Sequence, residues 1–361
     1  MRWSFGVGKI AGIRIEIHVT FVLFVGWIAL SRGLGVGDVG RALEAVLLLL
    51  LVFGCVLLHE LGHAMAARRY GIRTRDIILL PFGGVARLER MPERPQEEIV
   101  VAIAGPMVNV VLAGVLFFFV RDHILVNGEL NMQGGILEVL FFVNVVMLLF
   151  NLIPAFPMDG GRVLRALLAL RLSYAQATRI ASIVGQAVAI VFGIVGLLNQ
   201  VPTLIFVALF VFLAAGEERS VVESRAALSG IPVRAAMVTD FAALDASDPL
   251  QRAVDHLMSG SQQDFPVLSE GRFIGVLSRK TLVTGLQKNG AEASIGSVIE
   301  PYSDHADAQE PLEQALQRMR ANGRSVLPVL HHGALVGLIT LENVGELLLV
   351  QNALRRHSRP A

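Results

Sequence analysis

Residues 42–67 read ALEAVLLLLLVFGCVLLHELGHAMAA, an almost unbroken apolar run that ends in a group of ionisable side chains. A helix that crosses a bilayer needs about 20 mostly apolar residues, so this run predicts a membrane-spanning helix. The whole chain shows the same bias, because 54% of its 361 residues are hydrophobic and only 17% are charged. Soluble proteins carry about 25% charged residues. The chain is therefore predicted to be a membrane protein.

Apolar runs of similar kind recur through the first 215 residues. The six predicted spans cover residues 17–31, 42–67, 99–120, 135–156, 180–198 and 201–215. Arginines are concentrated between the second and third spans and between the fourth and fifth, and cytoplasmic loops carry such an excess. We therefore expect a multi-pass protein of the cell membrane whose N- and C-termini are both cytoplasmic.

Net charge and cysteine content exclude two other classes of protein. The net charge of +1 lacks the basic footprint that a nucleic-acid-binding protein needs, so no nucleic-acid partner is expected. Cys55 is the only cysteine in the sequence, which rules out an intramolecular disulfide framework. We interpret Cys55 as a small packing residue.

A shorter apolar segment, DIILLPFGGVARL at residues 76–88, cannot cross a membrane. Pro81, Gly83 and Gly84 stand near its middle, between two short β-compatible runs. This pattern predicts a membrane-associated β-hairpin, whose backbone must be satisfied by protein or by water in a cavity. An amphipathic surface segment is the alternative interpretation.

Two motifs predict a metal site. His59 and His63 are four residues apart and share one face of a helix, so both can bind one metal ion while Glu60 stays free to act as a base. Zinc in catalytic sites usually has three protein ligands and a water. The motif NLIPAFPMDGGR at residues 151–162 supplies Asp159 as the third ligand of one zinc ion, on backbone that its prolines and glycines should break. A helix cap or turn residue is the alternative interpretation of Asp159.

Together these motifs resemble the site-2 protease family of intramembrane zinc metalloproteases, over residues 1–220. The resemblance implies that His59, His63 and Asp159 are zinc ligands, that Glu60 is the catalytic base, and that the substrate is a membrane-embedded helix. The residues that match the family's Asn-Pro-Asp-Gly element are Asn151, Pro157, Asp159 and Gly160.

Further residues take expected roles in peptide-bond hydrolysis. Glu60 should take the proton of the attacking water and pass it to the leaving amine. Asn151 is predicted to donate a hydrogen bond to the substrate backbone or to the developing oxyanion, with helix packing as the alternative. In the third span, Asn109 is expected to pack near the site without a catalytic role. The hairpin residues predicted to bind an unwound substrate by strand addition are Ile77, Ile78, Leu79, Gly83 and Gly84.

The last third of the chain contains a duplication. The sequence FPVL at residues 265–268 recurs as LPVL at 327–330, and IGVLS at 274–278 recurs at the same offset as VGLIT at 336–340. Each copy predicts a helix, a strand, a turn at Gly271 or Gly333, a second strand and a second helix. The duplicated unit resembles a tandem CBS pair, which forms one α/β module with a cleft between the repeats.

The CBS resemblance implies a ligand and a mode of association. Members commonly bind adenine nucleotides, so Ser278 and Thr340 are candidate contacts for ATP or AMP. The family's pattern has an aspartate three residues later, where this chain has Thr281 and Asn343. A dimerisation or substrate-docking module is therefore the alternative, and association into homo-oligomers through the CBS modules is expected.

The sequence thus predicts a fold in two parts, an α-helical polytopic membrane domain of about six spans with a β-hairpin, followed by a cytosolic α/β tandem CBS module. The predicted parts are the metalloprotease domain at 1–222, a linker at 223–230, CBS repeats at 231–290 and 291–352, and a basic tail at 353–361.

The predicted function is hydrolysis of a peptide bond in or near a transmembrane segment of another protein. The family implies regulated intramembrane proteolysis, such as cleavage of an anti-sigma factor, with regulation by adenine nucleotide at the CBS pair. The alternative is a CBS-regulated transporter or metal-binding membrane protein without protease activity. Glu60 favours the enzyme, because a transport site does not need a base beside its ligands.

Overall fold

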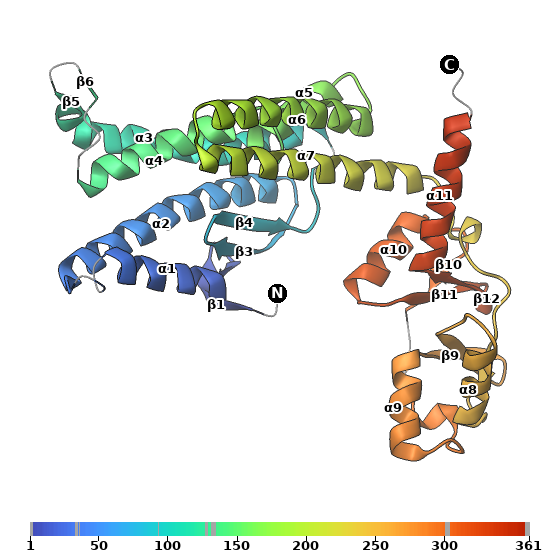
Figure 1. Ribbon diagram of the computed structural model, residues 1–361. Coiled ribbons are helices and arrows are strands. Elements are labelled where there is room, and N and C mark those ends of the chain that lie inside the picture. Colours follow the sequence, from blue (N-terminus) through green and yellow to red (C-terminus); the bar gives the residue numbers. More distant parts are fainter. Residues whose placement is uncertain are drawn as a thin grey trace. The chain divides into compact units, whose positions relative to one another are not determined.

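The computed structural model describes residues 3–32, 35, 37–92, 94–126, 129–130, 135–299 and 304–357 (Figure 1). The chain divides into two compact units, Met1–Val222 and Glu223–Ala361. The first holds the apolar helices and a four-stranded sheet, and the second is an α/β module. This arrangement confirms the predicted fold class.

Seven helices begin in the first unit among its described residues, and the last of them continues into the second unit. They are α1 (Val19–Arg32), α2 (Val39–Arg69), α3 (Pro95–Ile124), α4 (Ile136–Asn151), α5 (Asp159–Ala169), α6 (Tyr174–Leu198) and α7 (Pro202–Leu228). In the described ranges, α2, α3 and α6 are long and apolar enough to cross a membrane, and α1 and α4 are shorter apolar helices. A helix stands at each predicted span, and the number of six crossings stays a prediction.

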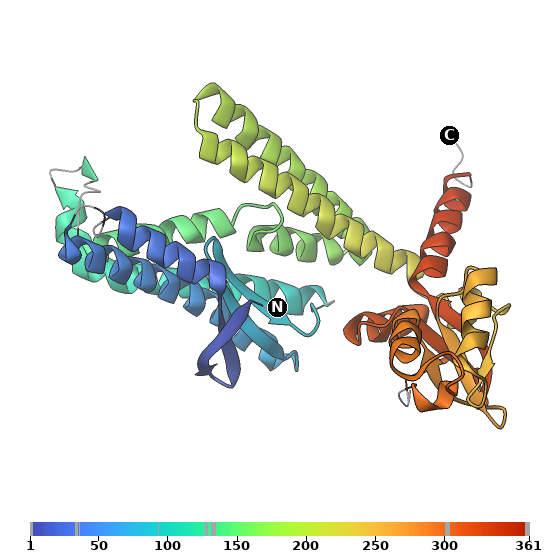
Figure 2. The ribbon, with the colours of Figure 1, turned by 60° about the horizontal axis from the view of Figure 1, so that its bottom comes forward.

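The predicted hairpin is half of a larger sheet. Its strands are β1 (Ser4–Ile10), β2 (Ile13–His18), β3 (Thr74–Leu80) and β4 (Gly83–Leu88), in the order β1-β2-β3-β4. The pairing of β2 with β3 is parallel and the other two pairings are antiparallel. Figures 1 and 2 show β3 and β4 beside α2, against which both strands pack.

The first hairpin was not expected from the sequence. β2 continues to His18, so α1 begins at Val19 and the predicted start of the first span at Ile17 is wrong. The signal was present, because Ala11 and Gly12 form a two-residue turn with positive φ at both positions between two strand-like runs. Such turns match the twist of paired strands.

The fourth apolar run also ends differently from the prediction. α4 stops at Asn151, because Pro154 and Pro157 follow and a residue before proline avoids helical backbone. The two glycines do not break helix as expected, since Gly160 lies in the first turn of α5. A Cβ there would stand 2.4 Å from the carbonyl oxygen of Leu152, so glycine is needed for the close return of the chain.

The second unit contains the predicted duplication. Its first repeat holds β7 (Leu244–Asp245), α8 (Leu250–Ser259), β8 (Phe265–Ser269), β9 (Arg272–Leu277) and α9 (Arg279–Asn289). Its second holds β10 (Ala306–Asp307), α10 (Leu312–Ala321), β11 (Val326–His331), β12 (Ala334–Thr340) and α11 (Leu341–His357). Each repeat forms a three-stranded sheet, in the order β7-β8-β9 or β10-β11-β12, in which the last two strands form a hairpin. The last four residues of the predicted basic tail lie outside the described residues.

The repeats exchange their leading segments. Val233 donates its backbone N–H to the carbonyl of Glu310 at 3.0 Å, and Val238 forms a bridge with Leu338, so the segment before the first repeat packs on the second. The segment before the second repeat returns to the first in the same way, through the bridge between Pro249 and Ser294. The packing units therefore differ from the sequence repeats, and the two halves form one module.

Candidate metal centre

Three ionisable side chains converge in the first unit. His59 and His63 lie one turn apart near the C-terminal end of α2, and Asp159 is the first residue of α5. The Nε2 atom of His63 lies 3.1 Å from Nε2 of His59 and 3.1 Å from Oδ2 of Asp159, and Nε2 of His59 lies 3.2 Å from the same oxygen. All three residues are buried, and they form a group that could hold a metal ion.

The triangle of ligand atoms fits a zinc ion. Ligands about 2.0–2.1 Å from a tetrahedral zinc stand about 3.3 Å from one another, close to the observed separations. Burial alone would raise the pKa of Asp159, but hydrogen bonds from His59 and His63 hold that pKa well below the usual range. Asp159 is therefore a carboxylate, which suits a ligand role.

The other nitrogen of each imidazole is fixed by α3. Nδ1 of His59 lies 3.1 Å from Oδ1 of Asn109, and Nδ1 of His63 lies 2.7 Å from the carbonyl oxygen of Val101. With a metal bound, each imidazole would keep its proton on Nδ1, and the Nε2 lone pairs would bind the metal in place of the hydrogen bonds to Asp159; such partners orient ligating histidines. Asn109, fully buried, thus touches a ligand directly, a role that the sequence analysis did not assign.

Helix α3 approaches the histidines at a glycine. A Cβ on Gly105 would stand 2.2 Å from Nε2 of His63 and 2.8 Å from Nε2 of His59. The imidazoles therefore lie directly against the backbone of α3. Gly105 thus makes room for the ligands.

Glu60 faces the sheet beside this cluster. Its Oε2 accepts a hydrogen bond of 3.2 Å from the backbone N–H of Ala86 on β4. A Cβ on Gly84 would stand 2.8 Å from Cγ of Glu60, so glycine allows this strand to lie against α2. Glu60 is not one of the three grouped ligands, and its carboxylate stays available as a base.

The sheet revises which hairpin residues can meet a substrate strand. Ile77, Ile78 and Leu79 lie on β3, whose two edges are already paired with β2 and β4, so their backbone cannot accept another strand. Gly83 and Gly84 lie on β4, at the edge of the sheet. The free edge of this hairpin is therefore that of β4, where the backbone N–H of Ala86 donates to Glu60.

Two other residues named in the sequence analysis, Asn151 and Cys55, are not among the grouped ligands. Asn151 is the last residue of α4 and is half-buried, and in the described ranges its amide bonds to no side chain. Cys55 is buried one turn before His59, and its sulfur accepts a hydrogen bond of 3.3 Å from the amide of Asn144.

A buried ionic cluster beside the metal centre was missed by the sequence analysis. Arg165 on α5 is fully buried, and its Nε donates to Oε1 of Glu98 on α3 at 2.8 Å. Its Nη1 donates to Glu218 on α7 at 2.5 Å, and its guanidinium stacks between the rings of Phe156 and Tyr174 at 4.9 Å from each centroid. Arg165 thus ties three helices to the loop that precedes Asp159. Because Arg165 lies between two predicted spans, its charge gave no signal of burial.

The second unit contains a cleft of about 1080 Å³ between the repeats. Ser278 and Lys280 line one side of this cleft, and Arg324 and Ser325 line the other. The Ser278 hydroxyl accepts the N–H of Thr281 at 3.2 Å and so caps α9. Thr340, the second candidate contact, does not line this cleft.

Comparisons with known proteins agree with both units. The model of peptidase family M50 matches residues 47–127 and 130–192, and the CBS domain model matches residues 233–288 and 299–349. A zinc metalloprotease of Methanocaldococcus jannaschii is 34% identical over 278 residues, which are 77% of this chain and 78% of that protein.

Two further relatives extend the comparison. The protein Rip3 of Mycobacterium tuberculosis is 30% identical over 376 residues, which cover 96% of this chain and 93% of Rip3. The solved structure of a site-2 protease from Methanocaldococcus jannaschii aligns with 60% of this chain and 95% of that chain, with 38% identity and a TM-score of 0.45.

Proposed function

Because this chain belongs to peptidase family M50 and is a zinc metalloendopeptidase of the site-2 protease type, we propose that it hydrolyses a peptide bond in or near a membrane-spanning segment of another protein. The supporting observation is the convergence of His59, His63 and Asp159 beside Glu60, at the end of a helix that is long and apolar enough to span a membrane. The family membership removes the transporter that the sequence left as an alternative.

The residues of the chain divide the chemistry among them. His59, His63 and Asp159 would hold the zinc ion, which when bound polarises the scissile carbonyl and lowers the pKa of water. Glu60 takes the proton of the attacking water and delivers it to the leaving amine. Asn151 is assigned to the substrate backbone or the oxyanion.

The edge of β4 is our candidate for the substrate-binding strand. A helical peptide bond is screened by its own turns, so a substrate must unwind before it is cut. The unwound segment can then pair with β4 by strand addition. Alternation along a strand places the outward backbone groups of Gly84 on the same edge as those of Ala86, whose N–H reaches Glu60. A strand paired there lies beside the base.

Photo-cross-linking tests the substrate class and the strand together. A photo-reactive residue in place of Val85, which is exposed on β4, should cross-link the Glu60→Gln chain to membrane proteins in native membranes. The cross-linked peptides should map to their membrane-spanning segments. Phe5 is an exposed apolar residue on β1, at the opposite edge of the same sheet, and is the matched control position. Equal yields at both positions, or cross-links only to soluble proteins, would contradict the proposal.

For the second unit we propose regulation by an adenine nucleotide. The cleft between the repeats contains basic side chains suited to phosphates, among them Arg279, Lys280 and Lys288. Ser278 lines this cleft and Thr340 does not, so the proposal now rests on the first of the two predicted contacts. Association through the CBS modules and cytoplasmic placement of both termini stay predictions, as do regulated intramembrane proteolysis and an anti-sigma factor as substrate.

Calorimetric titration of the full-length chain in detergent with ATP and AMP tests this ligand. Loss of a charged hydrogen bond costs about 1.5–3 kcal/mol, so Lys280→Ala should weaken binding about tenfold or more. Arg272→Ala, at an exposed position on β9 outside the cleft, should leave the affinity unchanged. Absence of binding heat with both nucleotides would instead favour the dimerisation or docking module.

A further inference from the structure

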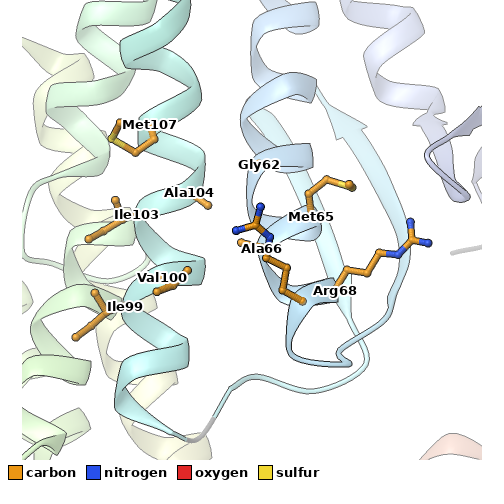
Figure 3. A pocket seen from close by; sticks show the side chains of 10 residues that line it. Gly62, Met65, Ala66, Arg68, Ile99, Val100, Ile103, Ala104 and Met107 are labelled. Atoms are coloured by element: carbon orange, nitrogen blue, oxygen red, sulfur yellow. The ribbon is translucent and has the colours of Figure 1, made fainter.

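A groove of about 690 Å³ runs between α2 and α3 on the outside of the helices (Figure 3). Its floor is formed by Gly62 and Ala104, where a Cβ on the glycine would stand 2.7 Å from the alanine carbonyl oxygen. Both helices are long and apolar enough to span a membrane. The groove is thus a depression in the apolar surface of these two helices.

The walls of the groove are apolar and open outward. Met65 on α2 and Val100, Ile103 and Met107 on α3 line it and are each more than a third exposed. Figure 3 shows these side chains on the two sides of the gap between the helices. The volume lies within the range of about 300–1,000 Å³ that is usual for small-molecule sites.

Two arginines stand at one end of the groove. Arg68 and Arg69 are in the last turn of α2 and belong to its lining, which contains no acidic residue. Arg68 donates to the carbonyl oxygen of Ala11 at 3.3 Å, and within the described ranges neither arginine has a carboxylate partner. Figure 3 shows the Arg68 side chain directed away from α3, so Arg69 is the cation that the groove offers.

The acidic residues nearest in sequence on the facing helix are already engaged. Glu97 and Glu98 lie in the first turn of α3. Glu97 is 3.5 Å from Arg94, and Glu98 is bonded to the buried Arg165. Arg69 is thus left for an external anion.

We propose that this groove binds an anionic phospholipid, with its phosphate on Arg69 and an acyl chain along Ile103 and Met107. An apolar groove lined by a guanidinium group matches an amphiphile better than a free anion or an uncharged helix. Basic pockets between spanning helices are known to bind anionic lipid head groups. The bound lipid would bridge α2, which carries both histidines, and α3, whose Val101 carbonyl fixes His63.

Native mass spectrometry of the delipidated full-length chain tests the head-group contact. Added phosphatidylglycerol should remain bound at least about fivefold more than phosphatidylcholine with the same acyl chains, since each arginine near a lipid surface contributes about that factor. The double variant Arg68→Gln/Arg69→Gln should lose this preference. The matched control Arg73→Gln/Arg75→Gln changes two exposed arginines outside the lining and should retain it. An equal loss in both pairs would show general cationic attraction and overturn the site.

A second variant tests the acyl-chain contact and separates a lipid from a free phosphate. Ile103→Trp places a large side chain in the groove at an exposed position, so folding should be preserved while phosphatidylglycerol is lost. Excess inorganic phosphate should fail to displace the lipid from the unmodified chain. Retention of the lipid by Ile103→Trp, or its complete displacement by phosphate, would overturn the proposal.

Discussion

Replacement of Glu60 by glutamine is expected to abolish proteolysis while the purified chain retains one zinc ion. The amide keeps the size of the side chain and an oxygen that can accept the N–H of Ala86, but it cannot take a proton from water. General acid–base catalysis typically contributes about 10²–10⁴-fold. Turnover of a membrane-spanning substrate should fall by about this factor or more, measured with the metal content of the same preparation.

The control is a glutamate-to-glutamine substitution at another position of α2. Glu44 is an exposed residue of α2, far in sequence from the metal cluster, so Glu44→Gln should leave both turnover and zinc content unchanged. His59→Ala and Asp159→Ala should lose zinc together with activity. Full activity in purified Glu60→Gln would show that Glu60 is not the catalytic base. The assignment of the metal ligands would then depend on the His59→Ala and Asp159→Ala variants alone.

The substitution Gly105→Ala is expected to remove zinc from the folded protein. The added Cβ would stand 2.2 Å from Nε2 of His63 and 2.6 Å from its Cε1, so the imidazole must leave its position. Changes that only disturb the partners of ligands typically cost about 10–100-fold in metal affinity. Direct displacement of a ligand should cost at least the upper value, measured by competition with a chelator, and proteolysis should fall with it.

Gly114→Ala supplies the matched control for this change. Gly114 lies on the same helix, and a Cβ there meets no atom within 4 Å. Alanine favours a helix over glycine by about 0.8–1.0 kcal/mol, so both variants should support α3 itself. Loss of zinc in Gly105→Ala with helix content retained would therefore report the clash. Equal zinc affinity in the two variants would contradict the position of α3 against the ligands.

Much of the site could be predicted because the spacing of its residues along the sequence is typical of a metal site. The imidazoles of His59 and His63 share a helical face whatever the surroundings, and the motif around Asp159 is long enough to be recognised. The repeats of the second unit were equally visible, since their hairpins recur at a constant offset. These features depend on local sequence and require no knowledge of packing.

The contacts that complete the site depend on which helices meet. Nothing in the spacing of α3 shows that Asn109 faces His59, or that Gly105 lies against both imidazoles. Arg165 was counted as a loop charge in the prediction of topology, yet packing buries it with Glu98 on another helix. The β3 residues of the predicted substrate-binding set were misplaced for the same reason, because β2 occupies an edge of β3 that the hairpin alone would leave free.

The separation of the ligands along the chain has a consequence for biosynthesis. Asp159 follows His63 by 96 residues, which a ribosome adds in about 5–20 seconds. The four strands of the sheet lie in the first 88 residues, so Glu60 can reach its partner on β4 before the carboxylate has been made. A nascent polypeptide halted in this interval has two imidazoles and no third ligand. The metal centre of the newborn chain is thus incomplete until the start of α5 has been translated.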